Sequence, residues 1–522
     1  MNTIIYSNGT KNILKIIRKV LIFITLFSTI FELIIFPSLS NFYGCLMMWV
    51  SFSILMYILR SDKYIIRYPF AFFVMISACL YRYLPVPSTL VELHPVSYGM
   101  VTPGRTFLLE TFLLVVTCAA FFIACRGYKK NRPIQKLFHS LSLNRVVKDR
   151  TLWVVGVVAL SAQFLVLVMG FSSYATVLYR VFVGFTGFMC APILTMFPCL
   201  YKTEYNEPVD LKKPNVWIYI VISVFVNLAT NSRENVIYPF ATVALFYLLY
   251  LCKMHVPVKK VFNIKRIIPI TIAIIISLVV LENISNAMLT LRSIRGDVNY
   301  SELIELTVEQ IFEGNVTVEK ALGNKEVSSY SHGWTEEYID NFLLNRYANI
   351  RITDETLYYA DRISNSQLMM EDLLNRLWML LPSPILSILG IDINKADYEY
   401  SRGDALYYYG GGPIGCLGGY RVTSHVADGL ITFGWAYFII QLLTFCILFR
   451  MLKWLTFYCR NGSTVYSIFG LVSVFEIFGL FRNSSGIYNE WSYILRNYWQ
   501  GIILFLIIET IGNILSRIRI RR

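Results

Sequence analysis

Charged residues are scarce in this sequence of 522 amino acids. They make up 15% of it, whereas apolar residues make up 56%, and the mean hydropathy is +0.54. Soluble globular chains carry roughly 25% charged residues, so this deficit excludes a soluble multidomain protein. Several apolar runs reach the roughly 18 residues that cross a bilayer. The composition therefore predicts a polytopic membrane protein.

The sequence also lacks the common motifs for nucleotides and metals. It contains no GxxxxGK[ST] motif, no GxGxxG between a strand and a helix, and no HExxH. Eight of the ten cysteines lie in or at the ends of apolar runs, and none forms a CxxC pair or a Cys/His metal spacing. We therefore expect no cofactor, no metal ion and no disulfide framework.

Twelve apolar runs predict twelve membrane-spanning helices, and the loops between them alternate in charge. Even-numbered loops are basic: residues 126–150, for example, hold eight Lys or Arg residues and one acid, Asp149. Because cytoplasmic loops carry the excess of positive charge, both termini are predicted to be cytoplasmic. The predicted spans are about 20–38, 42–59, 68–84, 106–125, 151–170, 181–200, 216–230, 235–252, 267–283, 429–449, 464–481 and 498–514.

The ninth loop is long and acidic. Residues 284–427 hold 11 Lys or Arg and 19 Asp or Glu, a net charge of −8 in a chain of net charge +14. The positive charge therefore reflects membrane orientation and not a nucleic-acid surface. We predict an all-α polytopic membrane protein in three parts: residues 1–283 with helices 1–9, residues 284–428 as one large extracytoplasmic loop, and residues 429–522 with helices 10–12 and a basic tail.

Three segments of this loop have distinctive patterns. Ser301 to Leu322 has the apolar periodicity of a helix. Leu377 to Gly390 is apolar but too short to span and is interrupted by prolines, so we predict an interfacial or re-entrant segment. Residues 398–421 are aromatic and rich in glycine, which predicts a loop region.

Arginines at the predicted outer ends of the helices are candidate phosphate-binding residues. Membrane topology does not require positive charge on that side, and guanidinium groups bind phosphate oxygens in pairs. The alternative is that these side chains snorkel or pair with neighbouring acids. They are Arg180, Arg233, Arg292, Arg295, Arg421 and Arg482.

His425 and Asp428 are candidate catalytic residues, because they lie where the large loop re-enters the membrane. An imidazole there could take a proton from a sugar hydroxyl, and Asp428, three residues further on, could orient the ring. Alternatively, Asp428 caps the tenth helix and His425 is an interfacial residue.

Tyrosines are candidate carbohydrate-binding residues. Twelve lie in residues 284–427, and Tyr407, Tyr408 and Tyr409 are consecutive. Aromatic faces pack against sugar rings, but tyrosine also collects at bilayer interfaces without any ligand. Acids inside predicted spans would instead suit a proton-coupled transporter: Glu32, Glu110, Glu476 and Glu509.

Two short patterns resemble those of a known family. NSRENVIYPF, which contains Arg233, is similar to a Ser-Arg turn between two spans, and SHVADGLITFGWAY has His425 leading into a helix with the Phe433-Gly434 pair. Together with the order of spans and the late outer loop, they resemble the Wzy-type polymerases. These enzymes join lipid-linked oligosaccharide repeat units of O-antigen and related polysaccharides, and are related to the O-antigen ligases.

The resemblance implies a metal-independent glycosyltransferase in the bacterial inner membrane, acting in O-antigen or other surface polysaccharide synthesis. Its substrate would be an oligosaccharide on undecaprenyl diphosphate, and a chain-length regulator would be its protein partner. His425 with Asp428 would activate the acceptor, the tyrosines would hold the glycan, and arginines, first Arg233, would bind the diphosphate. The alternatives are a lipid-oligosaccharide flippase or ion-coupled transporter, and a ligase.

Overall fold

The computed structural model describes residues 13–126, 133–141, 143, 147–169, 177–202, 209–228, 233–257, 306, 309, 330, 333–336, 338–459, 463–483 and 486–517. The predicted ninth span, residues 267–283, and nearly all of the predicted helix at 301–322 lie outside the described residues. The large loop is therefore described mainly from residue 338 onward.

Helices make up most of the described chain. The first part contains α1 (Ile13–Ile35), α2 (Leu39–Ile58), α3 (Lys63–Arg67), α4 (Pro69–Tyr83), α5 (Pro85–Val91), α6 (Pro103–Ala124), α7 (Pro133–Ser140), α8 (Asp149–Met169), α9 (Val177–Thr186), the 3₁₀ turns Ala191–Met196 and Pro198–Leu200, α10 (Pro214–Leu228) and α11 (Arg233–Lys253).

The large loop and the last part follow. The loop contains α16 (Phe342–Ala348), α17 (Arg351–Ala360), α18 (Gln367–Trp378), α19 (Ser383–Ile388), a 3₁₀ turn at Lys395–Tyr398, α20 (Arg402–Tyr409) and a 3₁₀ turn at Ile414–Cys416. The last part contains α21 (His425–Phe433), a 3₁₀ turn at Gly434–Ala436, α22 (Tyr437–Lys453), β1 (Thr456–Tyr458), β2 (Thr464–Tyr466), α23 (Ile468–Val472), α24 (Val474–Gly479), α25 (Tyr488–Ser492), a π-helical segment (Tyr493–Asn497) and α26 (Tyr498–Arg517).

Several of these helices are long and apolar enough to cross a membrane. Seven described segments meet that condition, and the pair α4 and α5, bent by 45° at its junction, makes an eighth if it forms one span. The seven are Leu39–Ile58, Pro103–Ala124, Asp149–Met169, Leu178–Met196, Asn235–Lys253, His425–Lys453 and Tyr488–Ser516. The structure confirms a mostly helical fold with several possible membrane spans, while the total of twelve stays a prediction.

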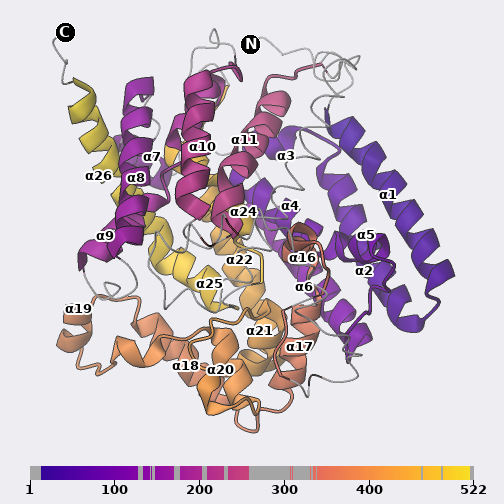
Figure 1. Ribbon diagram of the computed structural model, residues 1–522. Helices are drawn as coiled ribbons and strands as arrows, with labels where there is room; N and C mark the ends of the chain where they lie inside the picture. The colour runs from indigo at the N-terminus through magenta and orange to yellow at the C-terminus, as the bar shows by residue number, and fades with distance from the viewer. Residues whose placement is uncertain are drawn as a thin grey trace.

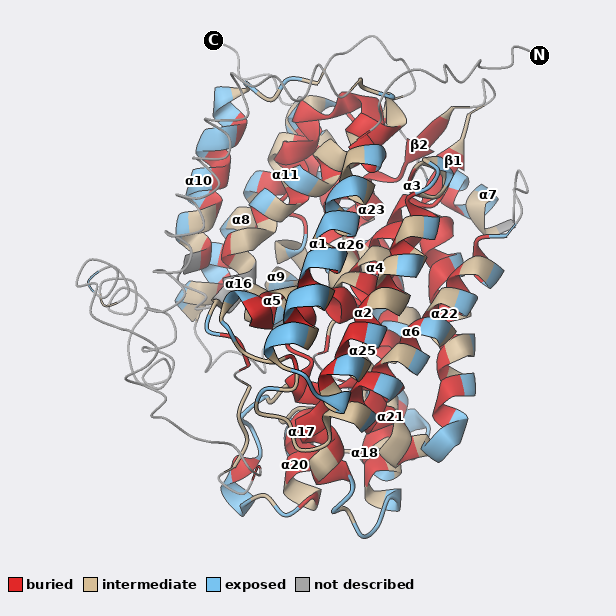
Figure 2. Ribbon diagram, turned by 90° about the vertical axis from the view of Figure 1, so that its right-hand side faces the viewer, coloured by how far each residue is buried: buried red, intermediate tan, exposed pale blue. Residues whose placement is uncertain are grey.

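The outward faces of the long helices are apolar. Figure 2 shows exposed residues along the outer faces of α1 and α10, and large side chains such as Phe23 and Ile34 on α1 and Phe225 on α10 are 69%, 72% and 63% exposed. Water would disfavour so much exposed apolar surface. A bilayer around these helices removes that cost.

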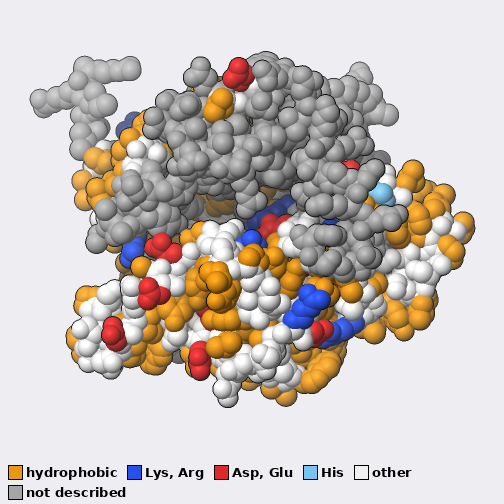
Figure 3. Space-filling view, turned by 60° about the horizontal axis from the view of Figure 1, so that its bottom comes forward, with side chains coloured by type: hydrophobic (Ala, Val, Ile, Leu, Met, Phe, Trp, Pro, Cys, Tyr) orange, Lys and Arg blue, Asp and Glu red, His pale blue; other side chains and the backbone are white. Residues whose placement is uncertain are grey.

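Most helices of the large loop lie at one end of the molecule, whereas α16 packs against α4 and α5 (Figure 1). In Figure 1, α17, α18 and α20 are at the bottom, whereas the start of α1 and the end of α26 are at the top. Seen from the bottom, the described surface is mostly apolar or uncharged, with Lys, Arg, Asp and Glu in small separate groups (Figure 3). We call the loop helices together the insert.

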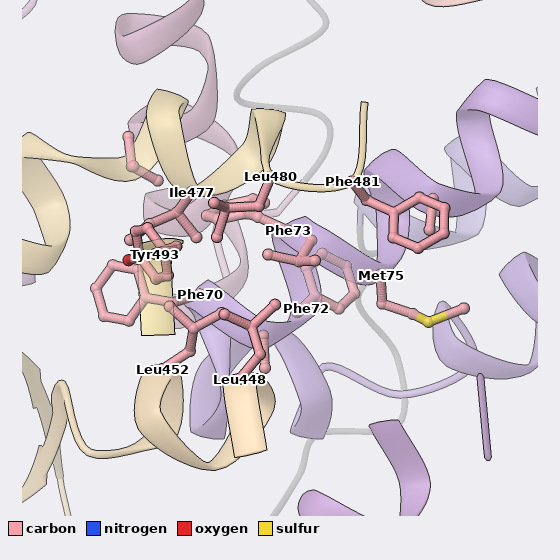
Figure 4. Packing of buried hydrophobic residues seen from close by; sticks show 14 of the residues in the cluster. Phe70, Phe72, Phe73, Met75, Leu448, Leu452, Ile477, Leu480, Phe481 and Tyr493 are labelled. Carbon is pink, nitrogen blue, oxygen red and sulfur yellow. The ribbon is translucent and has the colours of Figure 1, made fainter. Parts of the chain in front are cut away.

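The core joins the two ends of the chain. Aromatic side chains of α4 meet leucines of α22 and the residues around α24 (Figure 4). These side chains are nearly or fully buried: Phe70, Phe72, Phe73, Met75, Leu448, Leu452, Ile477, Leu480, Phe481 and Tyr493. This packing holds the segments that carry the polar side chains described below.

The prediction of one continuous helix over residues 464–481 is wrong. The segment begins with β2, which pairs antiparallel with β1 so that Val465 lies opposite Phe457. The hairpin docks on the α3 region, because the hydroxyl of Tyr466 donates to the carbonyl of Ile66 at 3.0 Å. Two short helices follow, separated at Ser473. β-Branched and aromatic residues favour the strand, and tertiary contacts fix it.

The prediction that residues 398–421 form only a loop is also wrong. Residues Arg402–Tyr409 form α20, which starts with a capping box. The hydroxyl of Ser401 accepts from the amide of Asp404 at 3.0 Å, and the Asp404 carboxylate accepts from the amide of Ser401 at 3.0 Å. This reciprocal cap satisfies two amides that a helix start leaves open, so a helix forms between the glycines.

Candidate functional site

His425 begins α21 and is fully engaged by neighbouring side chains. Its Nε2 lies 2.6 Å from the Glu490 carboxylate, a distance typical of an ion pair, although the angle is not that of a hydrogen bond. Its Nδ1 is 3.2 Å from the side-chain oxygen of Asn483. The ring stacks on Phe481 with centroids 5.4 Å apart, and only 1% of the residue is exposed.

A chain of hydrogen bonds runs from His425 to the first half of the protein. The Asn483 amide donates to the Tyr81 hydroxyl at 2.6 Å and to the Thr353 hydroxyl at 3.3 Å. Thr353, on α17, donates to the Glu110 carboxylate at 2.5 Å. Glu110 also pairs with Arg82 at 2.5 Å, and both side chains are 1% exposed. The network therefore links α4, α6, α17, α21 and α25 inside the protein.

This placement gives His425 a different partner from the one predicted. In this conformation the buried imidazole has both nitrogens in contact with protein groups, so it has no surface for a sugar hydroxyl. Glu490, not Asp428, orients the ring. The alternative prediction that Asp428 caps the helix is also wrong, because the cap is Ser424, whose hydroxyl accepts from the Ala427 amide at 3.0 Å.

Asp428 instead forms a buried ion pair with Arg402 of the insert. The guanidinium of Arg402 donates to Asp428, and it also lies 2.8 Å from Asp372 and 2.9 Å from the Thr432 hydroxyl. The amide of Ile487 donates to Asp428 at 2.9 Å. A Cβ on Gly486 would lie 2.1 Å from the same carboxylate, so only glycine fits there. These contacts fasten α18 and α20 to α21.

The predicted phosphate-binding arginines are not gathered in one place among the described residues. Arg421 pairs with Asp404 at 2.9 Å and lies 4.9 Å from the Tyr407 ring, so its charge is already balanced. Arg482 is half-buried beside Asn483. Arg233 is the first residue of α11. Arg292 and Arg295 lie outside the described residues.

Helix α11 packs against α24, on the segment that leads to Arg482. The hydroxyl of Tyr238 donates to the Val472 carbonyl at 3.1 Å, and its ring lies 5.1 Å from that of Phe475. Helix α11, which starts at Arg233, therefore lies beside α24, which ends shortly before Arg482.

The three consecutive tyrosines have different environments. Tyr407 is buried against Tyr359 and Trp334, with ring centroids 4.8 and 5.5 Å away. Trp334 stacks on Tyr359 at 5.7 Å. Tyr408 and Tyr409 are half-buried. The insert thus contains a compact aromatic cluster, defined here as Trp334, Tyr359 and Tyr407.

Glu355 is a candidate acid–base group that the sequence analysis missed. It lies on α17, one turn before Tyr359, and accepts a hydrogen bond from the Thr335 amide at 2.8 Å. Its second carboxylate oxygen is buried and accepts no hydrogen bond among the described contacts. Burial raises the pKa of Glu355 from its ordinary 4.5 to about 8, outweighing the Thr335 hydrogen bond and the charge of Arg351. Acids and bases with a pKa near neutrality are common at active sites.

The raised pKa of Glu355 predicts a pH-dependent stability. The folded state holds this proton more tightly than the unfolded state, so the stabilisation is complete below about pH 4.5 and is lost as pH rises to about 8. Its upper bound is on the order of 5 kcal/mol. Melting temperatures of purified protein at pH 5 and pH 8.5 measure the effect. We expect Glu355→Gln to remove much of the wild-type difference, and an unchanged difference would contradict the assignment.

Lys395, close to α19, is within electrostatic reach of two arginines from distant parts of the chain. Partial burial, followed by the charges of Arg496 and Arg180, lowers the pKa of Lys395. Lys395 Nζ donates to the Leu381 carbonyl at 2.7 Å, just before α19. Ile388 of α19 is 83% exposed, as suits the predicted interfacial segment, whose membrane contact stays a prediction. The sequence did not predict this group of Lys395, Arg496 and Arg180, because only the fold brings the three residues near one another.

Comparisons with protein-family models, with curated proteins and with solved structures found no match. The described residues contain no group of three or more His, Cys, Asp or Glu side chains arranged to hold a metal ion. Fold and composition therefore define only the class of protein. It is a largely helical protein with several helices suited to crossing a membrane.

Proposed function

We propose that this protein is a membrane glycosyltransferase that polymerises oligosaccharide repeat units carried on undecaprenyl diphosphate. The observation that carries the proposal is that Glu355, whose pKa is near neutrality, lies one helical turn from Tyr359 of the aromatic cluster. Both belong to the insert, at one end of the apolar helices. Aromatic faces suit sugar rings, and a carboxyl with a pKa near the working pH suits proton transfer.

In the proposed reaction, a hydroxyl of the incoming repeat unit attacks the anomeric carbon of the growing chain. A glycosidic C–O bond forms, the bond from that carbon to the diphosphate oxygen breaks, and the lipid diphosphate leaves. The ionised fraction of Glu355 accepts the hydroxyl proton on its second carboxylate oxygen, which accepts no hydrogen bond among the described contacts, and because Glu355 is buried this step requires the insert to open around it. His425, paired with Glu490, positions α21 against α25 and has no direct part in this scheme.

Cations stabilise the charge that builds on the leaving diphosphate. We assign this role to Arg233, at the start of α11, to Arg482, in the bend after α24, and to the group of Arg180, Lys395 and Arg496, where mutual repulsion favours an anion. Arg292 and Arg295 remain in the proposal on sequence grounds alone. Arg421, already paired with Asp404, would hold Tyr407 in place for the glycan, with Tyr408 and Tyr409 beside it.

A reconstituted assay tests the proposal. Purified full-length protein in vesicles receives a defined lipid-linked repeat unit, without nucleotide or metal, and the products are separated by size. We expect a ladder of longer glycans. Unchanged starting material would contradict polymerase activity. Movement of a fluorescent repeat unit across the bilayer would then favour a flippase, and transfer to a lipid A core acceptor would favour a ligase.

Replacing Arg233 by alanine should lower polymer formation by about 10²-fold, the usual effect of losing one group that stabilises developing negative charge. Glycan length in cells and in the vesicle assay measures the effect. The control is Arg60→Ala, which removes an exposed arginine at the start of the α2–α3 connection. Wild-type glycan length in the Arg233 variant would exclude the assigned role.

A further inference from the structure

Two adjoining cavities lie between α2 and α6, away from the insert. One is a groove of about 490 Å³ lined by side chains such as Trp49, Ile54, Val115 and Cys118. The other is a pocket of about 460 Å³ at the ends of these helices, lined by Lys63, Arg67 and Arg126 together with tyrosines. Phe122 lines both cavities, so the two adjoin at this ring.

The groove lies along the middle of two helices that are suited to crossing a membrane. Both α2 and α6 are long and apolar enough to span a membrane. Val115, on the wall of the groove, is 46% exposed, so the groove opens on the outer surface of the helices. Trp49 is fixed there, because its indole N–H donates to the Thr29 hydroxyl at 3.0 Å.

The pocket combines positive charge with tyrosines. Lys63 and Arg126 are exposed, and the described lining residues include no carboxylate. A fourth cation, the buried Lys453, lies 4.8 Å from the ring of Tyr68, which lines the pocket. The nearest acid in sequence, Asp62, faces His255, whose Nδ1 is 3.3 Å from its carboxylate. The described lining residues therefore carry a net positive charge.

Aromatic side chains form the boundary between the pocket and the groove. Phe122 packs edge-on against Tyr57 at 5.3 Å and Tyr64 at 5.9 Å. Tyrosine favours the level of lipid headgroups, where its ring is apolar and its hydroxyl reaches water. Membrane topology accounts for basic residues in the predicted cytoplasmic loops. It does not require three cations to line one cavity beside an apolar groove.

We propose that the pocket and groove bind one anionic phospholipid, with its phosphate among Lys63, Arg67 and Arg126 and an acyl chain against Trp49 and Phe122. Guanidinium groups bind phosphate oxygens in pairs, and an ammonium group adds a further charge. The site is at the opposite end from the insert and is independent of the proposed transferase activity.

Quenching of Trp49 fluorescence by brominated lipids tests the proposal. Full-length protein is reconstituted in phosphatidylcholine vesicles with increasing fractions of brominated phosphatidylglycerol or brominated phosphatidylcholine. A Trp49→Phe variant supplies the background from the other eight of the nine tryptophans. We expect half-quenching at a lower mole fraction of brominated phosphatidylglycerol than of brominated phosphatidylcholine. The two mole fractions should differ by about fivefold for each cation that contacts the phosphate. Equal curves for the two lipids would overturn the proposal.

The charge contribution is tested with matched triple variants. Lys63→Gln/Arg67→Gln/Arg126→Gln should remove the preference for phosphatidylglycerol. Lys148→Gln/Arg150→Gln/Arg450→Gln, which removes one lysine and two arginines from exposed positions outside the pocket, should keep it. If the first triple variant does not fold, Arg126→Gln alone should shift half-quenching about fivefold. Displacement of the lipid by millimolar glycerol 3-phosphate would assign the pocket to a soluble phosphate and overturn the lipid assignment.

Discussion

Replacing Arg402 by methionine should lower the free energy of unfolding by about 3 to 5 kcal/mol, because it leaves the buried Asp428 carboxylate without a cation, whereas Asp372 keeps its ion pair with Arg376. Arg402 is fully buried and contacts both Asp428 and Asp372, whose side chains are 0% and 2% exposed. Methionine fills similar volume but donates no hydrogen bond. Thermal unfolding of the purified protein, followed by tryptophan fluorescence and size-exclusion chromatography, measures the loss.

The matched control is Arg362→Met, another arginine of the insert. Arg362 is exposed and lies 3.7 Å from the Tyr358 ring, a contact worth about 1 kcal/mol or less at such a site. Adding Asp428→Asn to Arg402→Met should recover part of the stability, since it removes one unpaired charge. Equal melting temperatures for the Arg402 and Arg362 variants would contradict the role assigned to the ion pair.

Replacing Glu355 by glutamine should lower polymer formation by about 10² to 10⁴-fold, the usual contribution of general acid–base catalysis. The glutamine oxygen can still accept the Thr335 amide, and the amide resembles the protonated carboxyl present at neutral pH. The fold should therefore be retained. Initial rates of glycan extension in the vesicle assay measure the effect, and the rise of the wild-type rate toward pH 8 should be absent in the variant.

The control for this prediction is Glu371→Gln, which removes an exposed carboxylate of the insert. It should leave both the rate and its pH dependence unchanged. A Glu355→Gln protein that extends glycans at the wild-type rate would exclude Glu355 as the base, even if the polymerase activity itself is observed. The two conclusions can therefore fail separately.

Local features of the chain were predictable where one physical effect dominates. Apolar runs of about 20 residues, such as Pro103–Ala124 and Asp149–Met169, form long helices because a bilayer leaves few other ways to satisfy backbone hydrogen bonds. Shorter or mixed segments were not predictable in this way. Thr464–Tyr466 forms a strand because a hairpin partner is available, and Ser401 and Asp404 start a helix inside a glycine-rich stretch through a reciprocal cap.

The sequence by itself determined the class of protein, the apolar helices and the position of a long polar insert, since these depend on composition and length along the chain. Tertiary structure alone decided the partners of the polar side chains. His425 meets Glu490 and Asn483, Asp428 meets Arg402, and the pocket draws Lys63 and Arg126 from separate segments. A buried charge requires a partner of opposite sign, but the fold determines which one lies within reach.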